Sequence, residues 1–596
     1  MNNNTIEWDL SGLYSGPHDP KVTRDTASAN RLADDFVSLY RGNIGEKTAP
    51  TQLRDALKRL EKILEQAARP EMYASLLFST DVNNQAFGAL LNGTTDAYVQ
   101  ISKKLLFFEL DLAKLSEKTL NRFASDPSLK NYRHFILRQI DYKKHRLTEP
   151  EEKLLADKDQ TSKAAFARLF EQLISSKKFL FRKNSKKEIT LSETEILDLL
   201  HNPDRETRKA AARDFTLGLK DEVPKLSFIY NTLGFDKKIN DGYRKFENPE
   251  DSRHLDNEVT TEAVDALVGS VTKNYGMVAD YYRFKAKTLQ VGKLKDYDRY
   301  APTAKSSVKI PFVKGKDIIL DAFGEFDPEF RSIAKEFFDS RWIHASLKPG
   351  KRGGAYCSYL TPSLHPYVFV NYQDKIADVE TLAHELGHAI HGYLMRSQTL
   401  LNFDSPLTLA ETASVFAEMI VFDYLKQSLP PKERLALLMR TIEGLIASVF
   451  RQIAMFQFER DFHALRRNGE ITHEKISELW LNRQKEMFKG SIELTPDYAL
   501  WWSYIPHFFE TPFYVYAYAF GQLLTMSLYE RRNEPGFKLK YKDFLRSGGS
   551  KSPRELLAGL GVDTADPDFW QNGLNLIGKM VAEAKETYAS LKADRR

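Results

Sequence analysis

The sequence predicts a mainly α-helical protein with only a few short strands. Apolar residues recur at spacings of three and four over most of the chain. Strand-like alternation is confined to three stretches, and no fixed-period repeat indicates a solenoid. With 596 residues, of which 42% are hydrophobic and 28% charged, the chain is long enough for two or more domains with a large buried core.

Amphipathic spacing predicts helices in the segments 52–68, 73–92, 94–115, 151–175, 260–288, 432–466 and 573–592. Strands are expected in 177–191, 308–312 and 356–372. The first of these stretches reads as a solvated hairpin with its turn at Asn184 and Ser185. Near the carboxyl end, Thr511 is a suitable N-cap and Pro512 a favourable first residue, so we expect a helix from Phe513 onward.

A domain boundary is expected between residues 192 and 205. Ser192 followed by Glu195 marks one helix start, and the run Asn202 to Asp204 marks the next. No linker rich in glycine, serine or proline lies there. We therefore expect an amino-terminal helical domain over residues 1–200 that packs against a second domain over residues 201–596.

Composition and charge argue against several functional classes. The net charge of +5, from 86 basic and 81 acidic side chains, is close to balance and does not favour nucleic acid. The uncharged run 511–528 is too polar and too short for a membrane span. The single cysteine, Cys357, allows no internal disulfide, and the first ten residues show no secretory signal. These features predict a cytoplasmic protein without nucleic-acid or membrane partners.

The most informative motif is His384-Glu385-Leu386-Gly387-His388. On an ideal helix its two histidines lie about 40° apart, so both imidazoles can bind one ion. Glu385 is then placed to act on a metal-bound water without being a ligand. A buried helix with hydrogen-bonded core histidines is the alternative. Gly387 costs such a helix about 1 kcal/mol relative to alanine, which suggests that something approaches the backbone there.

A catalytic zinc requires a third protein ligand and an open position. His391 follows three residues later, but the extended motif would need glycine at 391 and histidine at 394, where this chain has Leu394. Glu411 and Glu418 lie seven residues apart on a second helical stretch, where their face is otherwise small and apolar. Because buried carboxylates need partners, we expect Glu411 to be the third ligand and Glu418 to orient a ligating histidine. A solvated helix face is the alternative for both.

These motifs resemble the oligoendopeptidase F branch of the thimet oligopeptidase family of zinc peptidases. The likeness rests on the histidine motif, on Glu411-Thr412-Ala413-Ser414 23 residues after His388, and on Glu418. It extends to three further stretches, Gly353 to Ser358, Pro366 to Tyr372 and Ile505 to Tyr516. The thimet branch proper has proline two residues after its glutamate ligand, where this chain has Ala413, and that difference favours the oligoendopeptidase F side.

The resemblance implies a zincin-type peptidase with two helical lobes around a deep channel and one zinc ion per chain. It implies cleavage of internal bonds in short unstructured peptides, with Glu385 as general base. It also implies that His507 and tyrosines lie over the scissile bond. Tyr514 and Tyr518 are the expected pair because they share one helix face, and Tyr516 is the alternative. A zinc exopeptidase and a non-catalytic peptide-binding protein with the same fold remain open.

Substrate binding is expected along backbone groups. If the segment 367–372 is an edge strand, its free N–H and C=O groups can pair with an extended peptide. Glycines 353 and 354 would allow close approach from the opposite side. The expected substrate-binding residues are Gly354, Ala355, Tyr356, Phe369 and Asn371.

Overall fold

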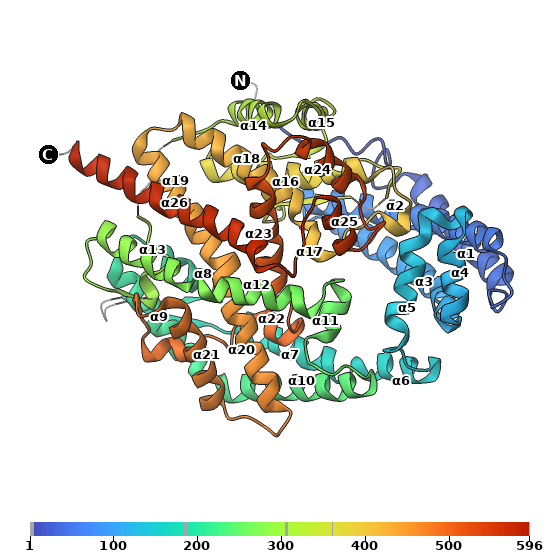
Figure 1. Cartoon of the computed structure of the whole chain (residues 1–596), viewed down its shortest axis with the longest axis horizontal. Coiled ribbons are helices and arrows are strands. Elements are labelled where there is room, and N and C mark those ends of the chain that lie inside the picture. Colours follow the sequence, from blue (N-terminus) through green and yellow to red (C-terminus); the bar gives the residue numbers. More distant parts are fainter. Residues whose placement is uncertain (1–4, 184–186, 304–307, 360, 595–596) are drawn as a thin grey trace. The chain divides into compact units, whose positions relative to one another are not determined.

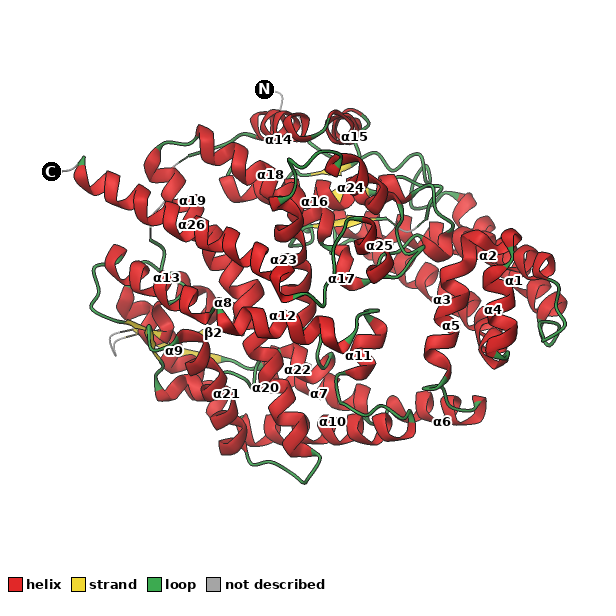
Figure 2. Cartoon of the chain, in the orientation of Figure 1, coloured by secondary structure: helices red, strands yellow, loops and turns green. Residues whose placement is uncertain are grey.

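The computed structural model describes residues 5–183, 187–303, 308–359 and 361–594. Helices dominate these residues and the strands are few and short (Figure 2), which confirms the predicted fold class. The chain forms two compact units, each assembled from three separate segments (Figure 1). The first unit comprises residues 1–144, 308–427 and 531–562, and the second comprises 145–307, 428–530 and 563–596. The division into residues 1–200 and 201–596 stays a prediction.

The first unit contains twelve α-helices and one three-stranded sheet among its described residues. The helices are α1 (Pro20–Tyr40), α2 (Pro50–Thr80), α3 (Gln85–Lys114), α4 (Glu117–Ser125), α5 (Arg133–Lys143), α14 (Phe312–Phe326), α15 (Pro328–Asp339), α16 (Ile376–Met395), α17 (Leu407–Ala410), α18 (Thr412–Ser428), α24 (Phe537–Arg546) and α25 (Pro553–Gly559). The strands are β4 (Ile343–His344), β5 (Tyr356–Ser358) and β6 (Tyr367–Phe369).

The amino-terminal helices α1, α2 and α3 pack around a core that includes Phe36, Leu57 and Phe108, none more than 1% exposed. The helix predicted over 73–92 is wrong in its bounds, because α2 continues to Thr80 and α3 begins afresh. The Asn84 side chain accepts hydrogen bonds from the amides of Ala86 and Phe87, and this N-cap starts the new helix.

The sheet of the first unit has the order β4-β6-β5, with β4 parallel and β5 antiparallel to β6. Helix α16 packs against β5 and β6. The strand expected at 308–312 is absent, since the described residues there form no ladder. The Ile310 amide makes a single bond to the Asp374 carbonyl, and α14 begins directly after Pro311, which has no N–H to donate.

The second unit contains fourteen α-helices among its described residues. They are α6 (Glu149–Asp159), α7 (Lys163–Ser176), α8 (Glu193–Asp198), α9 (Arg205–Lys220), α10 (Val223–Tyr243), α11 (Asp251–Asp256), α12 (Thr261–Lys273), α13 (Tyr275–Thr288), α19 (Pro431–Leu445), α20 (Arg451–Arg466), α21 (His473–Phe488), α22 (Pro506–Glu510), α23 (Tyr516–Glu530) and α26 (Pro567–Ala593). Its strands are β1 (Phe179–Lys183), β2 (Lys187–Leu191), β3 (Leu294–Lys295) and β7 (Ile492–Glu493).

Local signals predicted several of these elements. Strands β1 and β2 form the expected antiparallel hairpin, with Phe179 opposite Leu191, while its turn at Asn184 and Ser185 lies outside the described residues. The Ser192 hydroxyl caps α8 and the Asp204 carboxylate caps α9, as the sequence indicates. None of the helices in the described ranges has the length and apolarity that crossing a membrane requires.

The helix expected from Phe513 onward is wrong in its start. Phe513 has a positive φ of 60°, and α23 begins three residues later at Tyr516. A left-handed conformation is unfavourable for a residue with a Cβ atom, so contacts outside the segment must hold it.

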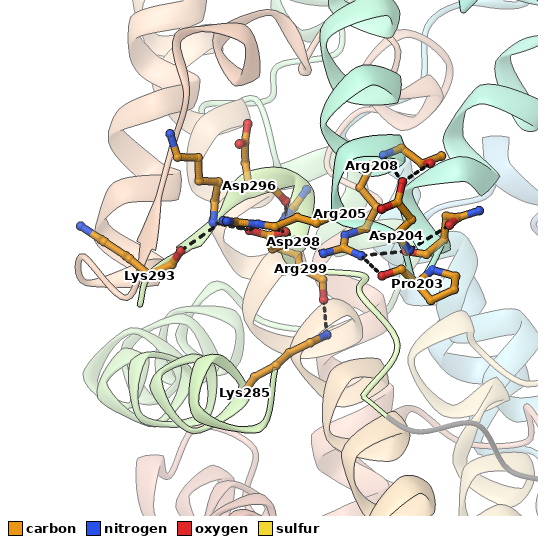
Figure 3. A network of polar contacts seen from close by, with 12 residues as sticks. Pro203, Asp204, Arg205, Arg208, Lys285, Lys293, Asp296, Asp298 and Arg299 are labelled. Carbon is orange, nitrogen blue, oxygen red and sulfur yellow. Dashed lines mark hydrogen bonds and ion pairs between the residues drawn. The ribbon is translucent and has the colours of Figure 1, made fainter. Parts of the chain in front are cut away.

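A buried ion-pair network fastens the loop after α13 to the start of α9 (Figure 3). Arg208 Nη2 donates to Asp298 Oδ1 at 2.8 Å, and Arg205 Nη2 donates to Asp298 Oδ2 at 2.8 Å. Asp298 is 0% and Arg208 4% exposed. Burial alone would raise the pKa of Asp298, but the hydrogen bonds from Arg205 and Arg208 outweigh it and hold the pKa below 3.8.

We expect Asp298→Asn to destabilise the second unit by about 3–5 kcal/mol, because Arg208 is left buried without its counter-charge. Urea denaturation measures this loss. Asp221, whose side chain is 80% exposed, supplies the control Asp221→Asn, which should change little. Because folding lowers the pKa of Asp298, its contribution is complete above pH 3.8 and is lost as the pH falls through the lower folded value. A loss in Asp298→Asn no larger than in the control would contradict the network's role.

Candidate metal centre

Helix α16 carries the histidine motif, and its packing against α18 explains the glycine within it (Figure 1). A Cβ atom at Gly387 would lie 2.5 Å from the Ala413 carbonyl oxygen and 2.6 Å from Ser414 Cα. Both are backbone atoms that cannot rotate away. The expectation that something approaches the backbone at Gly387 is therefore confirmed. Because glycine has no side chain, α16 and α18 can approach each other this closely.

We expect Gly387→Ala to force α16 and α18 apart and to lower metal affinity about 10–100-fold, because Glu411, which directly precedes α18, would move away from His384 and His388 on α16. Competition with a metal-binding dye measures the change. Gly444 lies within a helix of the second unit, and a Cβ there meets nothing within 4 Å, so Gly444→Ala is a matched control. Equal affinity in both variants would show that the close helix approach does not set the ligand geometry.

The structure brings His384, His388 and Glu411 together. Their nearest ligand atoms all lie within 4.8 Å of one another. Glu411 Oε2 is 3.4 Å from His384 Nε2 and 3.3 Å from His388 Nε2. Glu411 stands at the junction between α17 and α18, where its φ and ψ of −86° and 0° leave the regular helix. His391 is not part of this group: it is buried, and its Nε2 faces the Ser405 hydroxyl at 3.4 Å.

These donors fit a tetrahedral ion. With zinc–ligand bonds of about 2.0–2.2 Å, neighbouring ligand atoms of a tetrahedral site lie about 3.3–3.6 Å apart. The two nitrogen–oxygen separations of 3.3 and 3.4 Å match that spacing. Two imidazoles and one carboxylate are also the donor set of catalytic zinc sites, which keep one position open.

The electrostatics of the cluster favour a cation. Burial would lower the pKa of His384, but hydrogen bonds to Glu411 and Glu418 raise it to about 10. Burial would raise the pKa of Glu411, but hydrogen bonds from His384 and His388 hold it well below its ordinary range. Positive charge is therefore strongly stabilised between these side chains.

Two further side chains contact the clustered residues. Glu418 Oε2 lies 3.4 Å from His384 Nδ1, the nitrogen on the opposite side of the ring from Glu411. The Ser414 hydroxyl donates to Glu411 Oε2 at 2.7 Å. A carboxylate behind a ligating histidine fixes its ring and raises its basicity. Ser414 belongs to the motif that begins at Glu411, but its contact with the Glu411 carboxylate was not predicted, although its position three residues after Glu411 was available as a signal.

Glu385 is 6% exposed and lies on α16 beside His384. Burial raises the pKa of its carboxyl, and the two histidines partly offset that rise. A carboxylate whose pKa lies above its ordinary value is a better proton acceptor near neutral pH.

A cavity of about 610 Å³ opens beside these residues. His388 and Glu411 form part of its wall, and strand β5 forms another part through Tyr356, Cys357 and Ser358. Tyr359, Asp404 and Ser75 also line it, and the sequence analysis did not single them out.

The condition that segment 367–372 is an edge strand is not met by its strand residues. Tyr367–Phe369 form β6, which lies between β4 and β5, and β5 is one of the two edge strands of this sheet. Phe369 is 0% exposed. Asn371 Nδ2 donates to the carbonyls of Arg352 and Gly354 at 3.0 and 2.8 Å and so braces the glycine loop that leads into β5. Gly354 is exposed and has a φ of +82°, while Ala355 and Tyr356 are partly exposed.

In the second unit, the three residues predicted to lie over the scissile bond, His507, Tyr514 and Tyr518, form one aromatic cluster. His507 Nε2 lies 3.2 Å from the Tyr518 hydroxyl, and the ring centroids of Tyr514 and Tyr518 are 5.1 Å apart. Burial lowers the pKa of His507, and Arg451 lowers it further, so its ring is neutral at pH 7. Tyr518 is 38% exposed. Tyr516 is 0% exposed, and its hydroxyl is bonded to His254 Nδ1 and Asn257 Nδ2 at 3.0 and 2.9 Å, which makes it a core residue of this unit.

Comparison with known proteins agrees with this geometry. The model of peptidase family M3 matches residues 198–576, and a second model, described as oligopeptidase F, matches residues 111–179. The chain is 26% identical to oligopeptidase PepF of Bacillus subtilis, over 98% of this chain and 88% of that protein. It is 28% identical to an oligoendopeptidase F homolog of Borreliella burgdorferi, over 98% of this chain and 99% of that protein.

Solved structures share the fold. A crystal structure described as a peptidase from Chlamydophila abortus has a TM-score of 0.90 at 25% identity, with 98% of both chains covered. Oligoendopeptidase-F from Enterococcus faecium has a TM-score of 0.70 at 21% identity and covers 96% of this chain and 98% of its own.

Proposed function

Because this chain belongs to peptidase family M3 and is a metallo-oligopeptidase, we propose that it is a zinc-dependent oligoendopeptidase that hydrolyses internal bonds of short unstructured peptides. The observation that carries the proposal is the cluster of His384, His388 and Glu411 with the buried Glu385 beside it.

We propose that His384, His388 and Glu411 hold one zinc ion per chain. The separations between their donor atoms and the negative charge around His384 support this assignment. When bound, zinc supplies Lewis acidity, which polarises a carbonyl and makes water easier to deprotonate. Glu418 fixes the His384 ring through Nδ1, and Ser414 fixes the Glu411 carboxylate.

Glu385 then acts as the general base and acid. Its carboxylate takes a proton from the attacking water and returns it to the leaving peptide nitrogen. Its burial and raised pKa support this assignment, because a carboxylate whose pKa is raised is a stronger base than an ordinary one.

Strand β5 is the better place for a substrate backbone than β6, since β5 ends the sheet and lines the cavity beside His388 and Glu411. An extended peptide that adds to this edge would expose its carbonyl groups along the cavity. Pairing with a strand edge requires an unfolded segment, which favours short unstructured peptides as substrates. Gly354, Ala355 and Tyr356 are the proposed contacts.

His507, Tyr514 and Tyr518 are the proposed hydrogen-bond donors to the oxyanion that forms during attack. The short contact between His507 and Tyr518 supports a shared role, as does the partial exposure of both tyrosines. We also propose a cytoplasmic location, which the single Cys357 favours.

A panel of internally quenched peptides tests the function. Peptides with an acetylated amino terminus and an amidated carboxyl terminus separate the possibilities, because exopeptidases need a free end. We expect chelator-sensitive cleavage of the blocked peptides, restored by added zinc. Cleavage confined to unblocked peptides would identify an exopeptidase, and binding without cleavage would identify a non-catalytic peptide-binding protein.

A further inference from the structure

The turn that precedes α23 is held by a buried carboxyl far away in the sequence. Phe513 N–H donates to Glu459 Oε1 at 2.8 Å, across 54 residues. Glu459 is 0% exposed, and its other oxygen has no hydrogen-bond partner among the described residues. Phe513 is the residue with the positive φ of 60°, and it is 0% exposed as well.

One face of α20 contacts Phe513, and Lys237 of α10 lies over its ring with Nζ 6.0 Å from the centroid. Phe456, Glu459 and His463 lie three and four residues apart and so project from one side of the helix. The Phe513 ring packs edge-on against Phe456, with centroids 5.8 Å apart, and lies tilted against the His463 ring, with centroids 4.9 Å apart. Of these three side chains, Glu459 is the one that binds the backbone of Phe513.

The backbone conformation at Phe513 sets the positions of Tyr514 and Tyr518 relative to His507. His507 and Tyr514 stack on either side of this turn with ring centroids 5.7 Å apart, and Tyr518 meets both of them. The Tyr514 amide donates to the Thr511 carbonyl, and the Tyr514 carbonyl accepts from Ala517 at the start of α23. A rotation at Phe513 therefore moves Tyr514 and α23 relative to His507.

We propose that Glu459 is a positioning residue for peptide hydrolysis, which holds the left-handed turn at Phe513 so that His507, Tyr514 and Tyr518 meet in one cluster. This inference rests on the proposed function and deepens it. Glu459 acts through its hydrogen bond with the Phe513 amide, and the described contacts of His507, Tyr514 and Tyr518 with one another do not include it.

Because the Glu459 carboxyl has a raised pKa, Glu459→Gln is a matched variant of its neutral form. Burial raises the pKa of its carboxyl to about 8, although the Phe513 amide, Arg253 and Lys237 each lower it and Glu250 raises it. At neutral pH the carboxyl is therefore mostly neutral, and Glu459→Gln keeps the size, the neutrality and the accepting oxygen. Glu459→Met keeps the side-chain length but removes the oxygen that accepts from the Phe513 amide. Glu459→Asp shortens the side chain by one methylene and so moves the accepting carboxyl away from that amide.

Steady-state kinetics on a blocked quenched peptide test the proposal. We expect Glu459→Met and Glu459→Asp to lower kcat about 10–100-fold with KM within about twofold, and Glu459→Gln to remain near the wild type. Phe456→Leu weakens packing on the same face without touching the hydrogen bond, so its kcat should stay within about twofold. Equal loss of kcat in Phe456→Leu and Glu459→Met would overturn the proposal, because packing alone would then explain the effect.

Hydrogen exchange measured by mass spectrometry gives a readout that does not depend on turnover. Amide protection in the segment 508–516 should fall in Glu459→Met and Glu459→Asp and persist in Glu459→Gln. Unchanged protection in the Met and Asp variants would overturn the proposal. A wild-type chain without chelator-sensitive cleavage would contradict the proposed function, and the positioning role would fall with it. Wild-type cleavage combined with unchanged kcat in Glu459→Met would overturn the positioning role alone.

Discussion

Glu385→Gln is expected to abolish nearly all turnover while the chain keeps its metal. The amide has the same size but cannot accept the proton from water, so kcat should fall by about 10²–10⁴ or more. Glu385 is not among the three clustered ligand residues, and metal content should therefore equal that of the wild type. Initial rates on a blocked peptide, together with elemental analysis of the same sample, measure both quantities.

Glu418→Gln provides the contrast to Glu385→Gln. Glu418 Oε2 faces His384 Nδ1, and Glu418 is not one of the three clustered residues, so its loss should weaken metal binding about 10–100-fold and leave turnover of the fully loaded chain much less affected. If Glu385→Gln lost metal and Glu418→Gln lost turnover at saturating metal, the two roles would be reversed.

His388→Ala is expected to lose the metal itself and, with it, all hydrolysis. Two remaining protein ligands bind zinc far more weakly than three, and His388 is the partner of Glu411 Oε2 at 3.3 Å. Mass spectrometry of the dialysed protein measures metal per chain. His391→Gln is the matched control, because this histidine lies one turn further along α16 and outside the cluster. Metal loss in His391→Gln with retention in His388→Ala would exclude the proposed ligand set.

Local sequence signals predicted the proposed ligand residues because the geometry involved is that of one helix. The spacing of His384 and His388 places both rings on one face of α16, and Gly387 signals a close neighbour. The cost of burying a carboxylate pointed to Glu411. The partner of that glycine, the backbone at Ala413 and Ser414, is a tertiary contact that spacing alone does not reveal.

The errors share one physical cause, which is that distant contacts override local preference. Thr511 and Pro512 are good helix-start signals, yet the amide of Phe513 bonds to Glu459 and the helix begins later. The order of strands in a sheet is likewise a long-range property, so β6 could not be distinguished from the edge strand β5. The composition of the two units is also a long-range property, since each collects three segments that are not continuous in the sequence.

X-ray absorption at the zinc edge tests the central claim most directly, since it reports the atoms around the metal in the zinc-loaded wild-type chain. We predict two imidazole nitrogens and at least one carboxylate oxygen at about 2.0–2.2 Å, with a further light-atom ligand from solvent. The same spectrum from Glu411→Gln should lose the carboxylate contribution. A zinc environment without imidazole, or one unchanged when Glu411 is replaced, would contradict the ligand set on which the proposed hydrolysis depends.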